Sequence, residues 1–197
     1  TVVINRVSRY VIDVNRGENE RCGSYQTNLV YTTTTQGEEM YRIPLTAKET
    51  EERIKNYYAP YHNALIGAIR EKLKRYTRIY LLDLHSFGLD CEADIILGND
   101  FGKTCSNGII SFLKDKFGEN GFLPVENIPF SGAYITKNYC RQFPCCETVQ
   151  IELSYRAYIQ NRVFESGEEN PVIEQEYFKN QQKKMAAVYS SFREYLR

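Results

Sequence analysis

The 197-residue sequence lacks tryptophan, has only two histidines and carries no excess charge, because 25 Lys and Arg balance 25 Asp and Glu. A neutral chain offers no basic face for a nucleic acid. No apolar run approaches the roughly 20 residues that span a bilayer, and no secretory leader is evident. We therefore expect a cytoplasmic protein without nucleic-acid or membrane partners. The sequence indicates no oligomeric state.

The cysteines form no C-x-x-C pair, which argues against a zinc ribbon. For a cytoplasmic protein we expect all of them to be reduced. Cys105 follows the glycine-containing stretch 98–102 and is the best thiol for a Cys–His hydrolase that uses His85. The cysteines are Cys22, Cys91, Cys105, Cys140, Cys145 and Cys146.

Strand-like and helix-like segments alternate along the chain. The predicted strands are 10–14, 78–84, 93–98, 121–125 and 148–153. The predicted helices are 46–75, 106–117 and a last one that starts at Asn170–Pro171. The length suits one domain, residues 1–197. The alternation predicts the α/β class: a three-layer α/β/α sandwich with a mixed, mostly parallel central sheet.

Two of these segments carry clear local signals. Thr46 and Glu49 have the spacing of a capping box at a helix start, and Pro60 is expected to kink or split that helix. In 148–153 the apolar and polar residues alternate. Val149, Ile151 and Leu153 should therefore face one side of the sheet, and Thr148, Gln150 and Glu152 the other.

Polar residues follow or end three of the predicted strands. His85 comes where the strand 78–84 ends, Arg16 follows the strand 10–14, and Glu152 lies on the polar side of the last strand. Each residue has an ordinary structural explanation when taken alone. Together, an imidazole for a metal, a carboxylate to activate water and a guanidinium to hold a substrate carboxylate suit the hydrolysis of an acyl bond. His62, in the tyrosine-rich helix, is interpreted as structural.

Residues 8–16 (SRYVIDVNR) resemble the signature S-R-Y-V-I-D-L-N-R of the N-formylglutamate amidohydrolase family. Similar stretches follow in the family's order: 57–62 (YYAPYH), 83–86 (DLHS), 94–98 (DIILG), 127–132 (NIPFSG), 134–136 (YIT) and 150–153 (QIEL). The resemblance covers about residues 7–158. It implies a zinc carboxypeptidase-like, phosphorylase/hydrolase-like fold, in which helices cover both faces of a mixed sheet.

The resemblance also implies a site for a small substrate that has a free carboxylate. Asn15 and Arg16 would bind that carboxylate, and Tyr134 and Lys137 are further substrate-binding candidates. The family usually has Arg where this chain has Lys137, and a lysine cannot reproduce the two-pronged grip of a guanidinium.

The catalytic residues implied by the resemblance are His85 as a zinc ligand and Glu152 as the general base. The reaction would be metal-dependent hydrolysis of an amide C–N bond outside a peptide, with N-formyl-L-glutamate giving glutamate and formate. In the family, a histidine and an acidic residue complete the zinc site and precede the segment that matches Tyr10. We therefore expect the remaining ligands upstream of Thr1 and a domain that lacks its N-terminal part.

Three alternatives remain open. The chain could be a related zinc hydrolase of another N-acyl amino acid or short peptide. It could be a non-catalytic family member that binds a small carboxylate. The Cys–His hydrolase built on Cys105 is the third.

Overall fold

The computed structural model describes residues 1–19, 21–25, 27–160 and 172–196. The chain divides into two compact units, one formed by residues 1–79 and 133–135 and the other by residues 80–132 and 136–197. None of the helices in the described part of the chain combines the length and the low polarity that a bilayer span requires. The two units are described in turn.

The first unit contains a long helical segment that begins at the predicted capping box. Thr46 accepts a hydrogen bond from the Glu49 main chain, and Glu49 accepts one from the Thr46 main chain, so both ends of the box are formed. The segment consists of α1 (Ala47–Arg53), the π-helical turn η1 (Ile54–Tyr58) and α2 (Ala59–Leu73). Pro60 is the second residue of α2 and follows the π-helical turn directly, so it lies inside one continuous helical segment whose geometry changes just before it.

Buried residues follow this segment at four-residue intervals: Thr50, Ile54, Tyr58 and His62. An α-helix has 3.6 residues per turn, so such a stripe drifts around it. The wider π-helical turn absorbs part of the drift and keeps the stripe on one side. The apolar members of the stripe pack in a cluster whose other buried members are Ile12, Val14, Leu29 and Val30.

The predicted strand at 10–14 is wrong. Residues 9–11 form a turn, in which the main-chain N–H groups of Val11 and Ile12 both bond to the Ser8 oxygen. Asp13 N–H then bonds to the Leu29 oxygen. The alternating apolar residues therefore pack against the helical segment without forming a ladder. The unit's only described strands are the short parallel pair β1 (Cys22–Gly23) and β2 (Val30–Tyr31).

The second unit is built on a four-stranded mixed sheet with the order β3-β6-β4-β5. Its strands are β3 (Ile79–Phe87), β4 (Ile95–Gly98), β5 (Pro124–Glu126) and β6 (Cys146–Ser154). Strand β4 pairs parallel with β5 and antiparallel with β6. The mixed sheet agrees with the predicted fold class.

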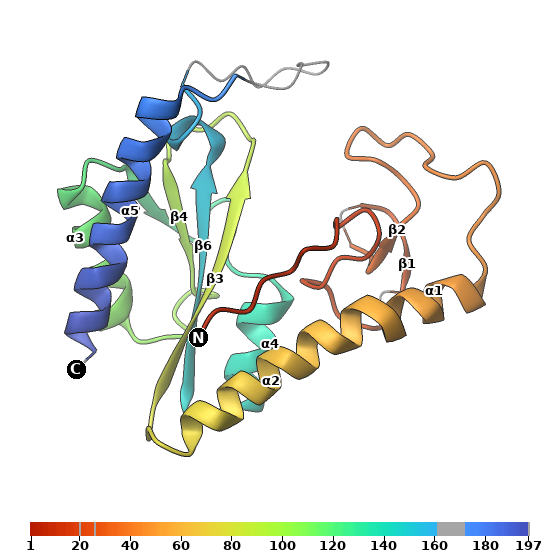
Figure 1. Ribbon diagram of the computed structural model, residues 1–197, viewed down its shortest axis with the longest axis horizontal. Coiled ribbons are helices and arrows are strands. Elements are labelled where there is room, and N and C mark those ends of the chain that lie inside the picture. Colours follow the sequence, from red (N-terminus) through yellow and green to blue (C-terminus); the bar gives the residue numbers. More distant parts are fainter. Residues whose placement is uncertain (20, 26, 161–171, 197) are drawn as a thin grey trace. The chain divides into compact units, whose positions relative to one another are not determined.

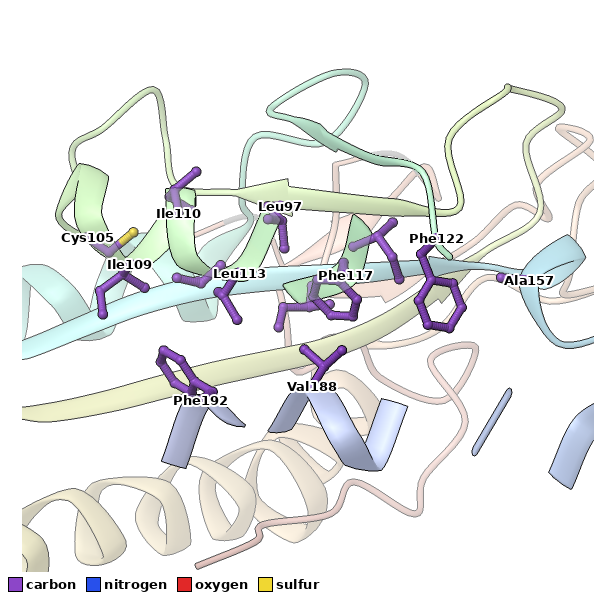
Figure 2. Packing of buried hydrophobic residues seen from close by; sticks show 13 residues of the cluster. Leu97, Cys105, Ile109, Ile110, Leu113, Phe117, Phe122, Ala157, Val188 and Phe192 are labelled. Carbon is purple, nitrogen blue, oxygen red and sulfur yellow. The ribbon is translucent and has the colours of Figure 1, made fainter. Parts of the chain in front are cut away.

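Helices cover one face of this sheet with an apolar cluster. Helices α3 (Asn107–Glu119) and α5 (Gln175–Tyr195) lie side by side along that face (Figure 1). Figure 2 shows Val188 and Phe192 of α5 facing Leu113 and Phe117 of α3. The sheet contributes Ile95, Leu97, Val149 and Ile151 to the same cluster.

The opposite face of the sheet is polar and also covered. Thr148 alternates with Val149 and therefore points away from the apolar cluster. Its hydroxyl donates to the main-chain oxygen of Thr136, in helix α4 (Tyr134–Gln142), at 2.6 Å. Thr136 and Thr148 are fully buried. Helices thus cover both faces, which is the predicted three-layer α/β/α arrangement.

Two further expectations differ from the structure. Strand β3 continues through His85 to Phe87, so His85 lies inside a strand and not in a following loop. Helix α4 was not predicted, because its apolar residues Ile135 and Tyr139 are too few to give a helical period. The predicted start of the last helix at Asn170–Pro171 lies outside the described residues.

A glycine in β4 gives a test of this packing. A Cβ atom at Gly98 would lie 2.7 Å from the main-chain nitrogen of Gly132, so Gly98→Ala should lower the free energy of unfolding by about 1–3 kcal/mol. The matched control is Gly118→Ala in α3, where a Cβ meets nothing within 4 Å and where alanine should stabilise the helix by about 0.5–1 kcal/mol. Urea unfolding of both variants measures the difference. Equal effects would contradict the close approach.

Candidate active site

The Asn15–Arg16 turn is anchored by contacts within the first unit. Asn15 is 5% exposed, and its Oδ1 atom accepts a hydrogen bond from the Ile135 main-chain N–H at 2.8 Å. The Tyr58 hydroxyl donates to the main-chain oxygen of Arg16 at 2.9 Å. Because distant parts of the chain hold the turn, the Arg16 guanidinium extends from a fixed backbone.

Asp13 is the buried carboxylate beside this turn. Its Oδ1 atom accepts the Asn15 main-chain N–H at 2.9 Å, and its Oδ2 atom accepts the Arg9 guanidinium at 2.7 Å and the Tyr31 hydroxyl. Burial alone raises the pKa of Asp13, but the charge of Arg9 and these hydrogen bonds outweigh burial and lower the pKa below its ordinary value. The carboxylate is therefore charged at neutral pH.

His62 has a structural environment, as the sequence suggested. Its ring is 8% exposed, packs on Tyr58 with centroids 4.1 Å apart, and places Nε2 3.0 Å from the Val14 main-chain oxygen. Burial lowers the pKa of His62 to about 4, although the hydrogen bond to Val14 acts in the opposite direction. The neutral ring donates to the main chain next to Asn15 and so supports the turn.

Tyr134 lies with the Asn15–Arg16 turn. A Cβ atom at Gly17 would be 3.3 Å from the Tyr134 ring, so the absent side chain lets the ring approach the main chain just after Arg16. The half-buried ring also contacts His62, with centroids 5.7 Å apart. Three of the predicted site residues, Asn15, Arg16 and Tyr134, are therefore neighbours in the first unit.

His85 and Glu152 lie on the same face of two neighbouring strands in the second unit. Leu82 of β3 and Ile151 of β6 pack on the apolar cluster, so the residues that alternate with them point to the opposite, polar face. Those residues include Asp83 and His85 on β3 and Glu152 on β6. Strands β3 and β6 are adjacent in the sheet. Alternation within the strands therefore places the imidazole and the carboxylate on one surface.

His85 is paired with the carboxylate two residues before it. Its Nε2 atom lies 2.8 Å from Asp83 Oδ1, and the Asp83 side chain is 7% exposed. A carboxylate at this distance fixes the orientation of the imidazole and favours the tautomer that carries the proton on Nε2. The extension of β3 through His85 makes this pair possible, because residues two apart share a strand face.

Glu152 is a buried carboxylate. It is 8% exposed, and the amide of Gln150, two residues earlier on the same face, donates from Nε2 to Glu152 Oε1 at 2.8 Å. Glu152 also lies directly opposite Ile96 of β4, which belongs to an apolar cluster on this face. The predicted alternation is confirmed. Glu152 is therefore a covered carboxylate and not a solvated surface charge.

Lys137 makes a contact that its predicted role did not include. Its ammonium group lies 3.2 Å from Asp100 Oδ1, and Lys103 lies 3.5 Å from the other oxygen. Burial raises the pKa of Asp100, but the hydrogen bond and charge of Lys137, with those of Lys103, outweigh it and lower the pKa. Part of the Lys137 charge is therefore compensated inside the protein.

The described residues do not supply a zinc site by themselves. A zinc ion needs three or four protein ligands, and no group of three His, Cys, Asp or Glu side chains suited to a metal occurs in 1–19, 21–25, 27–160 and 172–196. His85 fits one position, because metal-binding histidines usually have a carboxylate partner such as Asp83. The described residues therefore do not make a complete ligand set.

Cys105 is unsuited to nucleophilic attack. It is 6% exposed within the apolar cluster, and burial raises the pKa of its thiol to about 12. The thiolate is the reactive form, and almost none is present at neutral pH. All six cysteines are free thiols, as expected.

The sequence reasoning missed the partners of the candidate residues. Asp83 and Gln150 each precede a candidate by two positions, a spacing that places them on the same strand face. That signal was available in the sequence. Arg9 and Tyr31 meet Asp13 only through the irregular fold of the first unit, and no periodic pattern indicates that contact.

Comparison with known structures gives the fold class. A crystal structure of N-formylglutamate amidohydrolase from Ralstonia eutropha JMP134 matches with a TM-score of 0.74 and 23% identity, over 91% of this chain and 72% of that chain. A gene product from Agrobacterium tumefaciens matches with a TM-score of 0.65 and 17% identity, over 95% and 70%. At these identities the likeness concerns the fold. No match was found among curated protein sequences.

A mixed sheet between helices, with a buried carboxylate and an oriented imidazole on its polar face, places the chain in the α/β class. A comparison with models of protein families matches residues 1–159 to N-formylglutamate amidohydrolase. This match spans most of the chain. The chain therefore belongs to the N-formylglutamate amidohydrolase family.

The environment of His62 predicts a pH dependence of stability. The pKa of His62 is 6.5 in the unfolded chain and about 4 in the folded protein, so protonation of this ring favours unfolding. The contribution of the neutral ring to the free energy of unfolding is fully present above about pH 6.5 and falls as the pH drops toward 4. His62→Gln keeps a donor for Val14 but cannot titrate. Between pH 7 and pH 4 the wild type should lose roughly 2–3 kcal/mol more than this variant in urea unfolding. Parallel losses would contradict a neutral buried ring.

Proposed function

We propose that this protein hydrolyses the amide bond of an N-acyl amino acid, with N-formyl-L-glutamate as the preferred substrate. The observation that carries the proposal is a pair of oriented groups on one sheet face: the buried Glu152, held by Gln150, and the partly exposed His85, held by the buried Asp83. Membership of an amidohydrolase family supports it. Burial of the Asp83 and Glu152 carboxylates on one surface has a stability cost that a purely structural face avoids.

Glu152 is the proposed general base. A carboxylate that takes a proton from water must point in a fixed direction and lie where bulk water does not compete. Gln150 fixes one oxygen of Glu152, and the surrounding sheet face excludes most solvent. Glu152 would accept the proton of the attacking water and deliver it to the departing amine, while the water oxygen forms the new bond to the acyl carbon.

Arg16 and Asn15 are the proposed carboxylate-binding residues. A guanidinium can hold a carboxylate through two parallel hydrogen bonds, which fixes the ligand's direction as well as its position. The anchored turn is suited to this task because its backbone has little conformational freedom left to lose on binding. Tyr134 and Lys137 are proposed to contact the rest of the substrate. The contact of Lys137 with Asp100 makes its contribution weaker than that of a free cation.

Zinc is the proposed cofactor, and His85 is the ligand that this chain would supply. A bound zinc ion lowers the pKa of its water to about 7 and so makes the water a better nucleophile. Asp83 would keep the His85 ring in the orientation required of a ligand. The second candidate function is a non-catalytic protein that binds small carboxylates, and the specific observation that favours it is the anchored Asn15–Arg16 turn, which requires no metal.

Turnover and metal content together separate these functions. The purified protein is incubated with N-formyl-L-glutamate, N-formyl-L-glutamine and N-acetyl-L-glutamate, and formate or acetate release is measured. We expect about one equivalent of zinc, formate release that is fastest from N-formyl-L-glutamate, and loss of activity after chelation. Binding of glutamate without turnover or metal would support the non-catalytic function. Faster cleavage of another substrate would reassign the substrate within the same reaction class.

The variant Glu152→Gln tests the general base. Glutamine is isosteric and keeps the oxygen that accepts from Gln150, so the fold and the substrate affinity should persist. Loss of a general base lowers kcat by roughly 10²–10⁴-fold. The matched control is Glu119→Gln on the surface of α3, which should keep the wild-type rate. Wild-type kcat in Glu152→Gln would contradict the mechanism.

A further inference from the structure

Two arginines of the first unit compete for one carboxylate oxygen. Asp13 Oδ2 lies 2.7 Å from Arg9 Nη2 and 3.9 Å from Arg16 Nε. The Tyr31 hydroxyl donates to the same oxygen. At 2.7 Å the Arg9 contact is a charge-assisted hydrogen bond, whereas 3.9 Å is beyond hydrogen-bond reach. Arg9 and Tyr31 thus occupy the acceptor that Arg16 would otherwise use.

Aromatic rings hold Arg9 in this position. Its guanidinium carbon lies 5.1 Å from the centroid of the Tyr25 ring and 5.9 Å from that of Tyr31. The two rings contact each other at 4.7 Å, and Tyr10 packs on both. Cation–π contacts of this kind favour a fixed, partly desolvated guanidinium. The Arg9–Asp13 pair is therefore a persistent contact, although the Arg9 side chain is 47% exposed.

Arg16 is left with unused hydrogen-bonding capacity. Its Nη1 atom donates to the Asn15 main-chain oxygen at 3.2 Å. Its Nε atom is buried and has no hydrogen-bond partner within the described part of the chain. A buried guanidinium N–H without a partner is costly, and a nearby carboxylate would ordinarily satisfy it. The Arg16 side chain as a whole is 22% exposed, so a ligand can reach part of it.

We propose that Arg9, supported by Tyr31, is a positioning residue that occupies Asp13 and thereby keeps Arg16 available for the carboxylate of a substrate. Without Arg9, Asp13 would be a buried anion that has lost its charged partner, and its Oδ2 atom, which keeps only the Tyr31 hydroxyl, lies 3.9 Å from the Arg16 guanidinium. The Arg16 side chain would then turn to Asp13 and form an internal ion pair. The identity of the ligand rests on the proposed function. Which of the two arginines pairs with Asp13 is a property of the protein alone.

A purely structural role for Arg9 predicts a different effect of the double variant. If Arg9 only stabilised the fold, removing Asp13 as well would add a second loss. If Arg9 acts by occupying Asp13, neutralising Asp13 should undo the effect of removing Arg9. In Asp13→Asn the Oδ1 atom can still accept the Asn15 main-chain N–H, so the turn keeps its anchor.

The experiment compares the wild type with Arg9→Met, Arg9→Lys and the double variant Arg9→Met/Asp13→Asn. The first readout is the NMR signal of the Arg16 Nε–Hε group, assigned by its loss in Arg16→Lys. The second is the dissociation constant for L-glutamate by calorimetry. Where turnover is present, KM and kcat for N-formyl-L-glutamate provide a third.

In Arg9→Met we expect the Arg16 Nε–Hε signal to move downfield and its hydrogen to exchange more slowly, as an ion pair with Asp13 requires. The dissociation constant for glutamate and the KM should both rise by about tenfold or more, which is the equivalent of one charge-assisted hydrogen bond. The kcat should change little. Arg9→Lys should keep most of the affinity. The double variant should return both the signal and the affinity toward the wild type.

An unchanged Arg16 signal in Arg9→Met, or a double variant that binds more weakly than Arg9→Met, would overturn the inference. These outcomes differ from failure of the proposed function, in which the wild type neither binds glutamate nor releases formate. In that case the NMR comparison alone decides whether Arg9 keeps Arg16 from Asp13.

Discussion

The constraint on which both units depend is that a carboxylate removed from water needs a partner. Asp13, Asp83 and Glu152 are each less than a tenth exposed, and each has a polar neighbour at hydrogen-bond distance. The partners differ in kind: a guanidinium and a phenol, an imidazole, and an amide. The partner determines the net charge of each buried pair, and this net charge decides whether the carboxylate can act on a further group.

The central strand β6 shows how the fold accommodates such groups. Both of its faces are buried, but only one is apolar. The apolar face packs with α3 and α5, and the other carries Thr148, Gln150 and Glu152. Hydrophobic burial on one side thus supports a strand whose other side carries buried polar residues. A site built on a strand is held more precisely than one built on a loop.

Sequence patterns predicted the parts of this fold in which period and burial agree. The capping box at Thr46 and the alternation in 148–153 are local signals, and both were correct. The segment 10–14 has the composition of a strand, but its hydrogen bonds go to Ser8 and Leu29, which no local pattern indicates. Tertiary contacts decided its conformation.

In the candidate site, too, local patterns were predicted from sequence and tertiary contacts were not. The residue types at Asn15, Arg16, His85 and Glu152 were read from sequence, and the shared face of His85 and Glu152 follows from alternation along adjacent strands. The predicted end of β3 was wrong, because His85 and Ser86 look like the polar end of a strand although β3 continues to Phe87. The contacts of Asp13 needed the three-dimensional structure.

The π-helical turn η1 has a consequence for how this helical segment tolerates change. Each residue of an α-helix rotates the chain by about 100°, so an extra residue within one turn sets the angular phase of everything that follows. If residues 54–58 adopted regular α-helical geometry, Tyr58 and His62 would rotate away from the main chain of Val14 and Arg16, although every side chain would still be present. In this region the width of the helical turn is as specific as its composition.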